Sequence, residues 1–178
     1  LEDLEKNVVF TLLINKGDNG RKKINSITII KNGTSNQYKI EPKESKIDGL
    51  NFVSTGNEDG VLYKQVDNLI FGIPVVETSD SYKLKSIENQ AVLFKEFPLI
   101  GTEGFNLPVF IQHINFRPTE PRDGIVTKRE LEVTEEFIPD TNRSCLIDFK
   151  LEYLQFLDKV ISSKVENLHY LALSGLPN

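Results

Sequence analysis

The chain has 178 residues and a formal net charge of -5, and 39% of its residues are hydrophobic and 26% charged. This length and composition are typical of one soluble globular domain with its own core, and they exclude a disordered chain. The acidic balance argues against a dedicated nucleic-acid-binding protein, because affinity for phosphate depends on clustered Lys and Arg. The basic run at residues 21–23 lies beside glycine and asparagine, which favours a solvated hairpin tip over a binding patch.

The predicted elements of residues 1–139 are mainly β-strands. Residues 8–15, VVFTLLIN, form a continuous apolar run and are predicted as a buried strand. Asn32-Gly33 predicts a tight hairpin, because both residue types accept a positive φ. The other predicted strands are 24–30, 37–42, 60–66, 69–76, 82–87, 91–100 and 107–116, with Asp67-Asn68 as a turn between two of them. The alternation within 82–87 is typical of an exposed or edge strand.

Residues 140–178 are predicted to be helical. Apolar side chains recur there as one stripe at helical spacing: Leu146, Phe149, Tyr153, Phe156, Leu157, Val160 and Ile161. Candidate N-caps precede or begin the stripe: Thr141, Asn142 and Ser144. A shorter second helix is expected at 165–173, ended by Gly175 and Pro177. The whole chain, 1–178, is therefore predicted as a single α+β domain, in which a mixed, largely antiparallel sheet of about seven to eight strands is followed by C-terminal helices.

Cysteine content and hydropathy bear on the cell compartment. The single cysteine, Cys145, excludes an internal disulfide and is typical of a reducing compartment. No run approaches the roughly 18 apolar residues that a membrane helix needs, and the acidic N-terminus has no signal-peptide pattern. We therefore expect a cytoplasmic protein that binds neither membrane nor nucleic acid. Methionine is absent even from position 1, so we also expect the chain to be a fragment of a larger protein.

Few side chains offer catalytic chemistry. One cysteine and two histidines cannot form a zinc site of the usual spacing, and no phosphate-binding loop or nucleophile-elbow motif occurs. His113 is predicted to lie on the less buried face of a strand, and His169 is predicted to be a partly exposed helix residue. Cys145 is interpreted as a helix-start residue, although a Cys–His pair in space, and with it a hydrolase, stays open. We expect no complete reaction from this chain alone.

One apolar strand leads directly into a proline-rich segment with two arginines. The stretch is FPLIGTEGFNLPVFIQHINFRPTEPRDGI, residues 97–125, and it contains Arg117 and Arg122. Prolines on both sides reduce the entropy lost when such a loop is positioned. The simplest interpretation is a surface turn in which Arg122 pairs with Asp123 or Glu120. The alternative is a loop that presents arginine to a ligand.

Four motifs in this stretch resemble a known family. They are FPLIGTE at 97–103, LPV at 107–109, NF at 115–116 and TEPRDGI at 119–125. This run resembles the segment that follows the ATP-binding domain in sacsin-like members of the GHKL ATPase superfamily, and more weakly the middle domain of heat-shock protein 90 chaperones. The family's nucleotide pocket uses a helical Asn, an Asp-x-Gly turn and glycine-rich lids, and no such set is visible here. The resemblance therefore implies a transducer (middle) domain whose ATP-binding domain lies upstream in the same protein.

The resemblance also implies roles for individual residues. It identifies 115–125 as a catalytic loop whose arginine contacts the γ-phosphate of ATP in the upstream domain. Arg122 matches that arginine best and Arg117 second, and Asn115 is implied to contact the cofactor. A guanidinium offers a fork of donors that matches phosphate oxygens, and an arginine supplied by a neighbouring domain couples domain closure to hydrolysis. The chain has Pro-Arg-Asp at 121–123 where the chaperones usually have Ser-Arg-Glu.

The expected partners and cofactors follow from the same resemblance. ATP and Mg²⁺ would be bound by the parent protein and not by this chain alone. The partners would be the upstream ATP-binding domain and a client protein, and a homodimer is compatible because the chaperone relatives dimerise. The alternative function is a non-catalytic protein- or peptide-binding module, in which strand 82–87 accepts a peptide by edge pairing.

Overall fold

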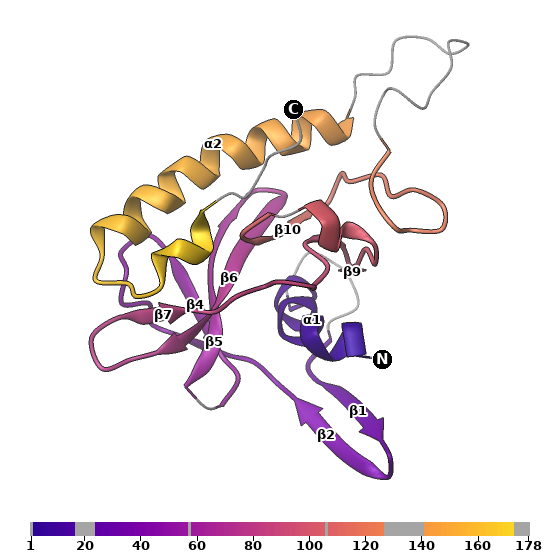
Figure 1. Ribbon diagram of the computed structural model, residues 1–178, viewed down its shortest axis with the longest axis horizontal. Helices are drawn as coiled ribbons and strands as arrows, with labels where there is room; N and C mark the ends of the chain where they lie inside the picture. The colour runs from indigo at the N-terminus through magenta and orange to yellow at the C-terminus, as the bar shows by residue number, and fades with distance from the viewer. Residues whose placement is uncertain (1, 17–23, 57, 106, 127–140, 173–178) are drawn as a thin grey trace.

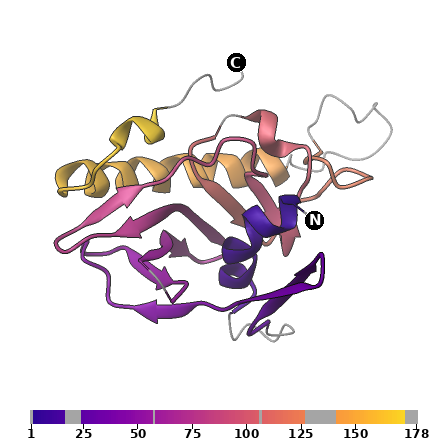
Figure 2. The ribbon, with the colours of Figure 1, turned by 60° about the horizontal axis from the view of Figure 1, so that its bottom comes forward.

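The structure is a computed structural model that describes residues 2–16, 24–56, 58–105, 107–126 and 141–172. In this part of the chain an α-helix lies on each face of a mixed, mostly antiparallel sheet (Figures 1 and 2). The predicted α+β class is therefore confirmed. Among the described residues, no helix has both the length and the apolar composition needed to cross a bilayer.

The larger sheet has eight strands among the described residues. They are β3 (Glu41–Lys43), β4 (Asn51–Ser54), β5 (Asp59–Val66), β6 (Leu69–Glu77), β7 (Tyr82–Leu84), β8 (Leu93–Lys95), β9 (Phe97–Pro98) and β10 (Phe110–His113). Their order is β3-β4-β5-β6-β10-β8-β9, and β7 pairs with the C-terminal part of β6. Among these described strands, the pairing of β10 with β8 is the only parallel one. The sheet prediction is confirmed, although β4 was not among the predicted strands.

A separate hairpin is formed by β1 (Ile27–Lys31) and β2 (Thr34–Tyr38). Its turn has φ of 51° at Asn32 and 78° at Gly33, as the Asn-Gly pair predicts. The turn between β5 and β6 likewise contains a positive φ, 48°, at Asp67. Figure 2 shows the hairpin beside helix α1 (Glu2–Ile14), and the Tyr38 hydroxyl donates a hydrogen bond to Glu5 Oε1 at 3.0 Å.

The prediction of a strand at 8–15 is wrong, because residues 8–14 belong to α1 and Asn15 lies in the turn that follows it. Buried side chains run from Asn7 to Leu13 with one partly exposed residue, Val9, among them. The helix packs against the sheet through Phe10 and has the β1–β2 hairpin beside it, so burial on two sides hides the 3.6-residue period. A short apolar run of this kind cannot be assigned to helix or strand by periodicity alone.

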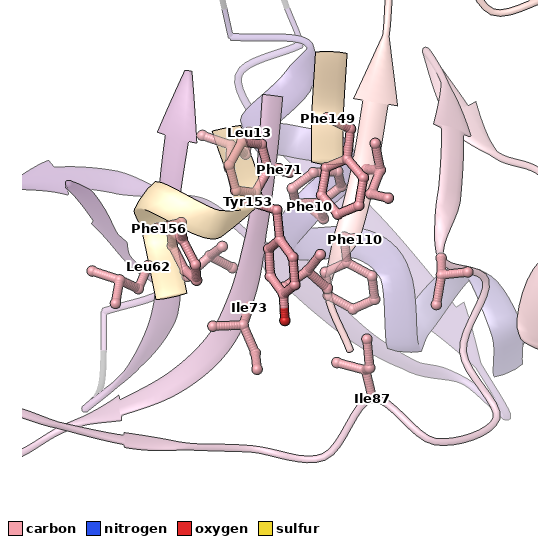
Figure 3. Close-up of a cluster of buried hydrophobic side chains, with 14 of the residues drawn as sticks. Phe10, Leu13, Leu62, Phe71, Ile73, Ile87, Phe110, Phe149, Tyr153 and Phe156 are labelled. Carbon is pink, nitrogen blue, oxygen red and sulfur yellow. The ribbon is translucent and has the colours of Figure 1, made fainter. Parts of the chain in front are cut away.

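Helix α2 (Thr141–Ser162) covers the other face of the sheet. Phe71 of β6 meets Phe149 and Phe156 of α2 edge-to-face, with ring centroids 5.3 and 5.4 Å apart (Figure 3). On the opposite face, Phe110 lies 5.2 Å from Phe10 of α1. The register explains this division, because Phe110 pairs with Gly72, the neighbour of Phe71, and successive strand residues point to opposite faces. The predicted stripe of α2 is confirmed as the packing face, except that Ile161 is exposed.

Strand β7 is not the free edge that the sequence indicated. The Glu166 N–H donates to Tyr82 O at 3.0 Å, and the Leu84 N–H donates to Glu166 O at 3.1 Å. Tyr82 and Leu84 are both buried. The C-terminal segment therefore already occupies the outer edge of β7. The helix predicted at 165–173 is replaced by a 3-10 turn, η3 (Leu168–Leu171), and Gly175 and Pro177 lie outside the described residues.

Candidate functional site

The arginine loop, residues 114–126, connects the end of β10 with the side of the molecule where α2 begins (Figure 1). Asn115, Arg117 and Arg122 are all exposed, whereas Phe116 and Ile125 are buried beneath them. The two apolar side chains attach the loop to the core. Asn115, Arg117 and Arg122 are therefore exposed to solvent on a loop whose apolar residues are fixed in the core.

Backbone hydrogen bonds close the loop upon itself. The Val126 N–H donates to Arg117 O at 3.0 Å, and the Thr119 N–H donates to Gly124 O at 3.1 Å. The Arg122 N–H donates to Thr119 O at 2.6 Å, which closes a tighter turn at the tip. Arg122 has a φ of 75°, a conformation in which a non-glycine residue is uncommon. The tip is thus a defined turn with Arg122 at a special backbone position.

The Arg122 side chain reaches back to the sheet. Its Nη2 donates to the carbonyl oxygen of Lys95, the last residue of β8, at 2.9 Å. Among the described residues it forms no ion pair with Asp123 or Glu120. Asp123 instead accepts a hydrogen bond from the Thr119 hydroxyl at 2.6 Å. The surface-turn interpretation gave Arg122 an acidic partner, whereas among the described residues its guanidinium donates to a backbone carbonyl.

The glycine turn of the FPLIGTE motif packs against the arginine loop. Gly101 has a φ of +114°, and a Cβ there would lie 2.7 Å from Asp123 O. The next residue, Thr102, is fully buried and fixes the turn, because its hydroxyl accepts from the Val92 and Leu93 N–H groups and donates to Leu99 O. The motifs at 97–103 and 119–125 are therefore in contact through Gly101 and Asp123.

Asn142 connects the loop to the first turn of α2. Its Oδ1 accepts from the Arg117 N–H at 2.8 Å, and its Nδ2 donates to Arg117 O at 2.9 Å and to Val126 O at 2.6 Å. Only 2% of the residue is exposed. The sequence suggested Asn142 as an N-cap, but it lies inside the helix, and its side chain serves the loop instead. It holds both ends of the closed loop at once.

His113 and Cys145 form a second connection between the start of the loop and α2, and Cys145 lies about one helical turn after Asn142. Cys145 Sγ lies 3.1 Å from His113 Nδ1, and the same nitrogen accepts from the Asn115 N–H at 3.1 Å. Because Nδ1 acts as an acceptor, the proton of the neutral ring lies on Nε2. The prediction that His113 lies on a less buried face is wrong: it is 6% exposed, because the start of α2 covers that face of β10. His169, by contrast, is exposed, and its ring lies tilted against that of Tyr170 with the centroids 4.2 Å apart.

Burial determines the chemistry of this Cys–His pair. Desolvation lowers the pKa of His113, and Lys95 lowers it further, while Asp148 acts in the opposite direction. A neutral imidazole cannot stabilise a thiolate as an imidazolium does. Cys145 is also only 3% exposed, so a substrate has no access to it in this conformation. The structure therefore brings together the pair that the sequence left open, and it gives the pair a structural role at the base of the loop.

The loop offers donors to an anion but few groups to a metal. Among the described residues, no group of three or more His, Cys, Asp and Glu could hold a metal ion. The arrangement is suited to binding phosphate oxygens through guanidinium donors, because the exposed arginines sit on a constrained backbone. Comparison of the chain with protein-family models, with curated proteins and with solved structures gives no match.

Proposed function

We propose that this chain is the transducer domain of a chaperone-like GHKL ATPase and that Arg122 contacts the γ-phosphate of ATP bound by an upstream domain. The observation that supports it is the arginine loop itself, which is closed by its own backbone bonds and tied to three other parts of the domain, yet keeps Arg117 and Arg122 exposed. A loop that is already ordered loses little entropy when it docks on a ligand.

Each contact between the loop and the rest of the domain supports an arrangement in which the loop presents Arg122. Asn142 holds its two ends, Gly101 packs against its tip, and the Lys95 carbonyl holds the Arg122 side chain. Arg122 uses one guanidinium N–H in that contact, and the guanidinium carries further N–H donors in the same fork that can meet phosphate oxygens. Asn115 lies in the loop two residues after the buried His113, and its side chain is exposed, as a polar contact with the nucleotide would require.

The parent protein would bind ATP and Mg²⁺ in its upstream domain. The residues described here would supply positive charge to the developing γ-phosphate and not the nucleotide pocket. Domain closure would then bring Arg122 to the phosphate, and hydrolysis would depend on that closure. A peptide-binding module based on strand 82–87 is less favoured, because Glu166 occupies the edge of Tyr82–Leu84.

The test is ATP turnover by the full-length parent protein at saturating ATP. We expect Arg122→Ala to lose roughly 10³-fold or more in rate while nucleotide still binds, as for other arginine fingers. Arg117→Ala should lose less, and Arg122→Lys should not restore the rate, because lysine lacks the planar fork. Lys164→Ala removes an exposed cation outside the loop and is the matched control. Equal turnover in Arg122→Ala and Lys164→Ala would contradict the proposal.

A further inference from the structure

The outward face of α2 carries large apolar side chains that the sheet does not cover. Ile147, Leu151, Leu154 and Ile161 are 52%, 60%, 57% and 61% exposed. A surface helix of a monomer normally presents polar residues on this side. The spacing of these positions, with Asp158 between the last two, follows the alternating four- and three-residue steps of a helix–helix seam. We call these five residues the α2 seam.

Charges of opposite sign lie on the two halves of the outward face of α2. Lys150 lies in the N-terminal half and Asp158 in the C-terminal half, and both are exposed. Neither forms an ion pair with another described residue. At about 100° per residue, both lie within about 60° of Leu154 around the helix axis, on the same outward face. The charges are therefore placed to meet a partner on this face.

We propose that the α2 seam binds the same seam of a second copy of this chain, with the two helices antiparallel and centred near Leu154. In this arrangement Ile147 of one copy lies near Ile161 of the other, because each is seven residues from Leu154. Lys150 and Asp158, each four residues from Leu154, then come within reach of each other in both halves of the contact. An isologous contact of this kind closes as a two-fold dimer.

The parallel arrangement is disfavoured by the same residues. It would place Asp158 of one chain beside Asp158 of the other, and Lys150 beside Lys150. Like charges at a helix seam repel each other. The antiparallel arrangement converts both repulsions into attractions. This self-complementarity favours a second copy as the occupant of the seam, and it does not depend on the function proposed above.

The size of the seam sets the expected strength. Helix α2 has 22 residues and is therefore about 33 Å long. One helix pair of this length buries a few hundred Å² per copy, which is less than the roughly 800 Å² per partner of standard stable interfaces. We therefore expect a reversible dimer with a dissociation constant in the micromolar range.

Sedimentation equilibrium of the chain, from low micromolar to several hundred micromolar, tests the proposal. The wild-type chain should show a monomer–dimer equilibrium, and Leu154→Lys should be monomeric throughout. Ile30→Lys is the matched control: it replaces an apolar residue that is 67% exposed on the β1–β2 hairpin, and it should dimerise as the wild type does. Circular dichroism should show that both variants remain folded, because each changes an exposed side chain.

Charge exchange and cross-linking then test the orientation. Lys150→Glu and Asp158→Lys should each weaken the dimer several-fold, and the double exchange should restore it. Mixed Ile147→Cys and Ile161→Cys chains should form a disulfide with each other on mild oxidation, whereas Ile147→Cys alone should not. A wild-type monomer at every concentration would overturn the proposal. So would a dimer that survives Leu154→Lys, and efficient cross-linking of Ile147→Cys to itself would overturn the antiparallel orientation.

Discussion

Replacing Asn142 with alanine should destabilise the domain and loosen the arginine loop. The substitution removes three hydrogen bonds that the side chain makes with Arg117 and Val126. Arg117 O keeps its hydrogen bond from the Val126 N–H. The Arg117 N–H and Val126 O lose their Asn142 partner, and the described residues offer them no second one. The effect should therefore be local to the base of the loop.

The magnitude follows from those two groups. A lost hydrogen bond costs about 1 kcal/mol net, and a buried group left without a partner costs about 1–3 kcal/mol. Water can reach part of this surface site, which favours the lower end of the range. Alanine also returns up to about 0.7 kcal/mol in helix propensity. We expect a net loss of about 2 kcal/mol in the free energy of unfolding.

Urea unfolding measures this loss, and amide hydrogen exchange localises it. The Arg117 amide should exchange faster in Asn142→Ala than in the wild type, because its acceptor is gone. Ser144→Ala, at an exposed position in the same turn, is the control and should change stability by less than about 0.5 kcal/mol. If Asn142→Ala unfolds like this control and the Arg117 amide keeps its protection, the anchoring role of Asn142 is wrong.

Three further predictions concern the residues that hold the loop at its base and at its tip. Burial lowers the pKa of His113, so its neutral form stabilises the fold above the ordinary histidine pKa of about 6.5, and this stabilisation is lost as the pH falls below that value. The free energy of unfolding in urea should therefore fall more steeply from about pH 7 to 5 in the wild type than in His113→Gln. Parallel pH profiles of the two proteins would argue against this role of His113. Cys145 should react with iodoacetamide at least about 10-fold more slowly in the native chain than in urea, and equal rates would contradict its burial. Gly101→Ala should cost about 2 kcal/mol or more, because of its positive φ and the approach of Asp123, whereas Gly104→Ala, which meets no atom within 4 Å, should be nearly neutral by the same unfolding assay.

Much of the fold was predictable where one stretch of chain determines its own conformation. The Asn32-Gly33 hairpin and the β5–β6 pair needed only turn chemistry and neighbouring strands. The stripe of α2 needed only the helical period, because one face is buried and the other is not. Helix α1 was assigned as a strand because contacts on two sides made its burial nearly continuous. The local hydrophobic pattern does not distinguish a helix from a strand where the element is buried on more than one side.

The candidate site divides in the same way. The sequence by itself determined that residues 115–125 form a proline-rich loop with Arg117 and Arg122, because prolines and the strand before them restrict the chain locally. Only the tertiary structure decided what holds that loop. Asn142 meets Arg117 across 25 residues, and Cys145 meets His113 across 32. Such contacts depend on how α2 lies on the sheet. That packing is determined by side chains distributed over the whole core, and not by the few residues of these contacts themselves.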